Sequence, residues 1–166
     1  MQEDRRLNKL NEELIVTGTG VITLGFWTVI KLFLMLIFKF DEINALLDGD
    51  LTNPEQRWIV ILIVIIVCLL IIGFRSYVGL SARAEGMGRH KLGLYIIVAI
   101  FILVFEVVGT IDGLEDFVDA SFDKTVDNAI QLLVDITSYL ILGQMIFSAI
   151  AVRILKARRR GGKADE

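Results

Sequence analysis

Four long runs of apolar residues, separated by polar links, dominate the pattern of hydrophobic and polar positions along this chain of 166 residues. The runs cover Leu14 to Phe38, Trp58 to Phe74, Leu92 to Ile111 and Ala129 to Val152. A helix needs about 20 mostly apolar residues to cross a bilayer. The runs also lack the short alternation that is typical of strands in a transmembrane barrel. The pattern therefore predicts four membrane-spanning helices.

Signals in the links extend these helices beyond the apolar runs. Pro54 suits the first position of a helix, so the second helix is expected to begin near it. Gly79, Ala82 and Gly86 recur at spacings of three and four after the second run, which favours close contact with another helix. We expect a single domain with spans at about residues 14–38, 55–78, 91–113 and 127–155, and a basic tail at 153–166.

The composition supports the same fold class. Hydrophobic residues make up 55% of the chain, above the 45–50% that is usual for soluble domains, and the mean hydropathy is +0.67. The expected fold is all-α, an integral membrane four-helix bundle.

Arginine and lysine are distributed unevenly among the polar segments. The N-terminal segment, the link that begins at Arg75 and the C-terminal tail hold thirteen of them, whereas the other two links hold three. The positive-inside rule therefore predicts a multi-pass protein of the cell membrane with both termini and the Arg75 link in the cytoplasm. An even number of spans agrees with this orientation.

Three of the runs each contain one ionisable residue in their interior, namely Lys31, Glu106 and Asp135. Counted at about 1.5 Å per residue from the expected cytoplasmic ends, all three lie in the outer half of the bilayer. An unpaired Asp or Lys at the centre of a spanning helix costs about 2.5–3.5 kcal/mol. We therefore expect Lys31 to pair with Glu106, Asp135 or both, in an intramembrane polar cluster that includes Gln131.

The cluster has more than one interpretation. Two acids against one base leave a carboxyl group that would hold a proton or a cation. Alternatively, the pair has a purely structural role and sets the register of the helices. Lys31 could also extend its long side chain to the outer headgroups and leave the cluster.

The third run is suited to close packing on the face that carries Glu106. Gly109 and Gly113 lie on that face, four residues apart. Small residues at this spacing let two helices approach closely. This face is therefore expected to contact the rest of the bundle.

The fourth run carries a second polar line, formed by Thr137, Gln144 and Ser148, and Gln144 lies about opposite Asp135. A helix with two polar faces is expected to meet its own bundle on one face and a neighbouring subunit on the other. The line therefore predicts a homo-oligomer. The alternative is that these side chains are isolated and bond back to their own backbone.

Residues for catalysis or for metal binding are scarce. His90 is the only histidine and Cys68 the only cysteine, so the spacings of metal ligands and an internal disulfide are absent. No nucleophile stands in a catalytic motif, and the basic tail accompanies no nucleic-acid-binding fold. Tyr77 and Tyr95 fit ordinary interfacial anchors. We therefore expect neither an enzyme nor a bound cofactor, metal or nucleic acid.

Two functions fit these features. The first is that of an accessory or scaffold subunit, which acts in the lipid bilayer through helix packing and oligomerisation with its own copies or with another membrane protein. The alternative is a subunit of a channel or transporter that conducts protons or cations through the Lys31, Glu106 and Asp135 cluster.

Overall fold

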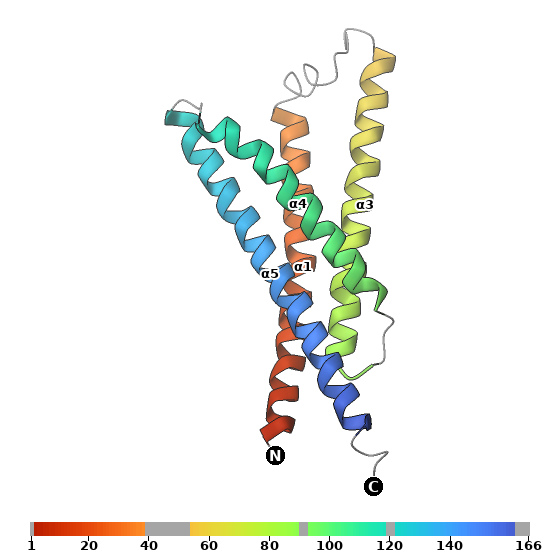
Figure 1. Cartoon of the computed structure of the whole chain (residues 1–166). Helices are drawn as coiled ribbons and strands as arrows, with labels where there is room; N and C mark the ends of the chain where they lie inside the picture. Colours follow the sequence, from red (N-terminus) through yellow and green to blue (C-terminus); the bar gives the residue numbers. More distant parts are fainter. Residues whose placement is uncertain (1, 39–53, 90–92, 119–121, 162–166) are drawn as a thin grey trace.

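The computed structural model describes residues 2–38, 54–89, 93–118 and 122–161, and these form four helices. The helices are α1 (Gln2–Phe38), α3 (Pro54–Gly86), α4 (Leu94–Val118) and α5 (Phe122–Gly161). The described residues contain no strand, so the all-α prediction is confirmed. The start of α1 and the end of α5 lie at the same end of the molecule, which we call the terminal end (Figure 1).

Three of the helices are long and apolar enough to cross a membrane. Their apolar stretches are Arg5–Leu34 in α1, Ile61–Gly86 in α3 and Leu132–Arg158 in α5. Helix α4 contributes a shorter apolar stretch, Leu94–Val108, within the part of the chain whose side chains are described. Large apolar side chains cover the outside of all four helices, as lipid contact requires.

The second long helix, α3, begins and ends at sequence signals. Pro54 occupies its first position, where the missing N–H is not needed for the helix. Its other end is closed by Gly88, which has a positive φ of 83°. The N–H of Gly88 donates to the carbonyl of Glu85 (3.0 Å), and the N–H of Arg89 donates to that of Ala84 (2.9 Å). This is a Schellman cap, which satisfies carbonyls that the helix leaves free.

The helices pack most closely near the terminal end. Helices α1 and α3 run side by side, while α5 crosses α1 and packs with α4 (Figure 1). The buried core gathers residues from the first half of α1, the last half of α3, the start of α4 and the last half of α5, including Leu14, Val78, Tyr95 and Met145. Toward the other end, α4 and α5 diverge from α1 and α3 (Figure 1).

Small residues bring α1 and α3 into backbone contact. A Cβ atom at Gly79 would overlap the carbonyl oxygen of Gly18, and one at Gly86 would lie 2.7 Å from the carbonyl oxygen of Asn11. Ala82 also faces Gly18 and is fully buried. The structure thus places Gly79, Ala82 and Gly86 against α1. The other predicted packing pair, Gly109 and Gly113, lies in α4, in a part of the helix whose contacts the structure does not describe.

Candidate functional site

An arginine occupies the interior of the bundle. Arg75 is only 5% exposed, although it follows directly after an apolar run. Its aliphatic stem lies against α1 at Gly25, where a Cβ atom would be 2.8 Å from the Arg75 Cδ. The glycine therefore makes room for the arginine stem.

Arg75 forms an ion pair with Glu106 of α4, from its Nη2 to the carboxylate Oε1. The same Nη2 donates to the Ser138 hydroxyl of α5 (3.3 Å), which in turn donates to Oε2 of Glu106 (3.2 Å). The hydroxyl of Tyr139 donates to the backbone carbonyl of Glu106 (3.0 Å). We call Arg75, Glu106, Ser138 and Tyr139 the central network. It joins α3, α4 and α5 deep in the bundle.

The other two predicted charges lie beside this network. The carboxylate of Asp135 attracts both Lys31 and Arg75 electrostatically. Lys31 is half-buried and shares a face of α1 with Gly20, which meets Ile141 of α5. The structure therefore brings Lys31, Glu106 and Asp135 to one region of the bundle. Gln131 lies in α5, in a part of the helix whose side-chain contacts the structure does not describe.

The sequence interpretation missed Arg75 as the partner of Glu106. It assigned Arg75 to a cytoplasmic link because the apolar run stops at the residue before it. The helix continues to Gly86, as the small residues after the run indicated, and Arg75 lies on the buried face of α3. A signal was present, because the small-residue stripe of Gly79, Ala82 and Gly86 extends back to Arg75 at a spacing of four.

A second network closes the bundle at the terminal end. The guanidinium of Arg153 donates two hydrogen bonds to the carboxylate of Glu85, from Nε to Oε1 (2.9 Å) and from Nη2 to Oε2 (2.7 Å). The Tyr95 hydroxyl donates to the same Oε2 (2.9 Å), and the guanidinium lies 5.6 Å from the centre of the Tyr95 ring. We call Glu85, Tyr95 and Arg153 the terminal network. It joins α3, α4 and α5 a second time.

The interpretation of Tyr95 as an interfacial anchor is wrong, because its side chain is fully buried. Tyr95 lies in the first turn of α4, where that helix meets α3 and α5. The Tyr95 hydroxyl finds its polar partner there in Glu85, so it does not need the headgroup region. Tyr77, by contrast, is exposed on α3.

The polar line expected on α5 is divided by the crossing of the helices. Ser148 is fully buried, and its hydroxyl donates to Oε2 of Glu13 on α1 (3.2 Å). Thr137 and Gln144 are exposed, and the Thr137 hydroxyl bonds to the carbonyl of Leu133 (2.8 Å). Helix α5 crosses α1 at an angle (Figure 1). The polar line therefore contacts α1 at Ser148 but faces outward at Thr137 and Gln144. Ser148 therefore does not belong to an outer face.

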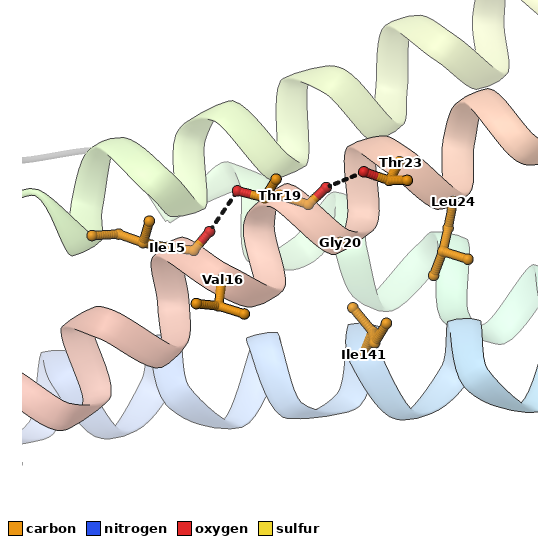
Figure 2. Close-up of a pocket in the computed structure, with 7 residues that line it drawn as sticks. All are labelled: Ile15, Val16, Thr19, Gly20, Thr23, Leu24 and Ile141. Carbon is orange, nitrogen blue, oxygen red and sulfur yellow. Dashed lines mark hydrogen bonds between the residues drawn. The ribbon is translucent and has the colours of Figure 1, made fainter.

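A shallow groove of about 490 Å³ runs along the outside of α1 beside α5 (Figure 2). It is lined by Ile15, Val16, Thr19, Gly20, Thr23, Leu24 and Ile141. Its two threonine hydroxyls donate to carbonyls of their own helix, those of Ile15 (2.9 Å) and Thr19 (3.1 Å). The wall therefore presents mostly carbon, and it offers no nucleophile, acid or base.

The described residues contain no group of three or more histidine, cysteine, aspartate or glutamate side chains that could hold a metal ion. Cys68, the free cysteine, is half-buried on α3. The geometry of both networks is that of contacts between helices, with each carboxylate bound by an arginine and a hydroxyl group.

No family model, no curated protein and no solved structure matches this chain.

Proposed function

We propose that this chain is a four-span membrane protein with both termini in the cytoplasm, and that it acts as an accessory or scaffold subunit in a membrane assembly. Three helices meet the requirements of a span, and the described part of α4 is apolar as well. The terminal end carries the basic residues Arg5, Arg89 and Arg158, all exposed, which supports a cytoplasmic location for this end.

The observation that carries the scaffold role is the charge balance around the central network. Two cations, Lys31 and Arg75, accompany two carboxylates, Glu106 and Asp135. The addition of Arg75 removes the surplus carboxyl group on which proton or cation binding would depend. A conducting site needs a group that takes up and releases its ion, whereas balanced charges in a bundle set the position of helices.

The arrangement of the contacts supports the same role. The central and terminal networks both connect α3, α4 and α5, and the Ser148–Glu13 hydrogen bond connects α5 to α1. These contacts use charged and hydroxyl groups inside the bundle and leave many large apolar side chains on the outside of the helices. Such a surface suits contact with lipid and with other membrane helices, and the proposed role needs no catalytic residue.

Reconstitution into sealed liposomes tests this function against ion conduction. Proton and cation flux is measured with dyes sensitive to pH and to membrane potential, with empty liposomes and Lys31→Met as controls. We expect the wild-type protein to be as tight as empty liposomes, and a defined membrane complex to be recovered from mild detergent. A flux that is present in the wild type and lost in Lys31→Met would overturn the scaffold role in favour of conduction.

A further inference from the structure

The exposed side of α5 carries a regular stripe of residues spaced alternately by four and three. We call this the α5 stripe; it consists of Leu133, Thr137, Leu140, Gln144, Phe147, Ala151 and Ile154. All of these side chains are exposed except that of Ala151, which is half-buried. A repeat of 3.5 residues along one helix is the pattern by which two helices wrap around each other.

The two kinds of position in the α5 stripe differ in character. One kind holds the large apolar residues Leu133, Leu140, Phe147 and Ile154. The other holds the smaller or polar residues Thr137, Gln144 and Ala151. In parallel pairs of helices, a single polar residue at one core position sets the register and the number of partners. Gln144, the middle residue of the α5 stripe, is the polar residue at such a core position.

The amide of Gln144 is exposed among apolar side chains, with Leu140 at 68% and Phe147 at 70% exposure on either side of it. It forms no hydrogen bond with the part of the chain that the structure describes. Thr137 differs, because its hydroxyl is satisfied by its own backbone. An unsatisfied amide in hydrocarbon is costly, and hydrocarbon tails of lipid offer it no donor or acceptor.

We propose that two copies of this chain pair in parallel along the α5 stripe, with their Gln144 side chains hydrogen-bonded to each other across a two-fold axis normal to the membrane. The partner of the α5 stripe is a second copy, because the amide of Gln144 has both a hydrogen-bond donor and an acceptor and can therefore pair with an identical amide. Copies inserted in the same orientation also place Gln144 at the same depth, where a two-fold axis brings identical residues together. The pairing rests on the proposed function, since it assumes that α5 spans the membrane, and it specifies the interface of the oligomer.

Single cysteines test the register in membranes that contain the full-length protein. The native cysteine is removed by Cys68→Ala, and Leu140→Cys or Phe147→Cys is added on the α5 stripe. The control, Ile150→Cys, is also exposed on α5 but lies about 120° around the helix from Gln144. We expect mild oxidation to yield disulfide-linked dimers at Leu140→Cys and Phe147→Cys, because a disulfide needs Cα atoms within about 7 Å, and few at Ile150→Cys.

Equal cross-linking at all three positions would overturn the proposal, since it would indicate random collision. An absence of cross-linking at both stripe positions would overturn it as well, and would leave the α5 surface to lipid or to a different protein.

The role of the amide is tested by Gln144→Leu and by the conservative Gln144→Asn, with dimerisation measured by energy transfer between labelled copies in liposomes. Because position 144 is exposed, neither change disturbs the bundle interior. We expect Gln144→Leu to weaken dimerisation about tenfold, the order of one hydrogen bond between membrane helices, and Gln144→Asn to retain most of it. An unchanged dimer fraction in Gln144→Leu would overturn the amide pairing.

The two sets of experiments fail separately. A monomeric protein in liposomes that remain tight would contradict the α5 pairing and leave the scaffold role standing. A cross-linked dimer that conducts ions would contradict the scaffold role and leave the pairing standing.

Discussion

Arg75 is a permanently charged side chain in surroundings from which water is almost excluded, since it is 5% exposed. Such a group is tolerated only when its charge is compensated by a partner. Glu106 supplies the opposite charge, and Ser138 bridges the two groups. Removal of one partner is therefore more damaging than removal of both, because the loss of one leaves an uncompensated charge in the interior.

We expect Glu106→Gln to lower the free energy of unfolding by about 3–5 kcal/mol, as found when one partner of a buried pair is removed. The double change Arg75→Met with Glu106→Leu is expected to restore most of this loss. Reversible unfolding in mixed micelles with a denaturing detergent measures both. Lys31→Met is the matched control and is expected to cost less, because Lys31 is half-buried and forms no ion pair with the described residues. Equal stability of Glu106→Gln and the wild type would contradict the pairing.

Part of the central network could be predicted from sequence. Glu106 and Asp135 are recognisable because each interrupts an apolar run. Arg75 was not recognised because it stands at the end of its run, where an arginine usually marks the membrane boundary. Hydropathy reports which residues are apolar, but not where a helix continues inward beyond them. The terminal network is even harder to predict from the sequence, because Glu85 and Arg153 lie in charged segments that resemble ordinary links and tails.

At the scale of the elements, the closest contact is that between α1 and α3. Asn11, Gly18 and Gly25 follow each other at intervals of seven on α1, and they face Gly86, Gly79 and Arg75 in reverse order on α3. This antiparallel match along one seam is typical of helices that cross at about 20°. The sequence predicted the seam on α3 from its small residues. It did not identify α1 as the partner, because the spacing of small residues on one helix does not show which other helix packs against them.

Glycine substitutions on α3 test this seam. Gly79→Ala adds a Cβ atom that would overlap the carbonyl oxygen of Gly18, so the helices must move apart. We expect a loss of about 1–3 kcal/mol in the free energy of unfolding, as for other overpacked sites. Gly73→Ala is the matched control on the same helix, because its Cβ atom would meet nothing within 4 Å. It is expected to be neutral or to gain up to about 1 kcal/mol from helix propensity. Equal effects at both positions would contradict a close α1–α3 contact.

At the scale of the whole molecule, the bundle is closed at the terminal end and diverges at the other (Figure 1). The core and the terminal network both lie toward the terminal end. That the described residues form four helices and no strand could be predicted, because a long apolar run in lipid must pair its backbone groups within a helix. The closer packing at the terminal end could not be predicted, because it depends on the angles at which the helices cross, and hydropathy gives no information about these angles.

The proposed orientation is tested by cysteine labelling in intact cells that express the protein in a Cys68→Ala background. Arg89→Cys and Arg158→Cys lie on exposed positions at the terminal end, and we expect a membrane-impermeant maleimide to label them only after the membrane is opened. Asp50→Cys, in the link between α1 and α3, is expected to react in intact cells. The reverse pattern would invert the orientation, and labelling of all three would contradict the four spans.

The pairing of Arg75 with Glu106 imposes an order on biogenesis. Helix α3 precedes α4 in the chain, so the guanidinium of Arg75 is synthesised before its carboxylate partner. Until α4 has been made, Arg75 has no Glu106 carboxylate to compensate its charge. The synthesis of α4 supplies the carboxylate of Glu106, which compensates this charge. A chain that stops before α4 therefore leaves the Arg75 guanidinium without the carboxylate that compensates it in the complete bundle.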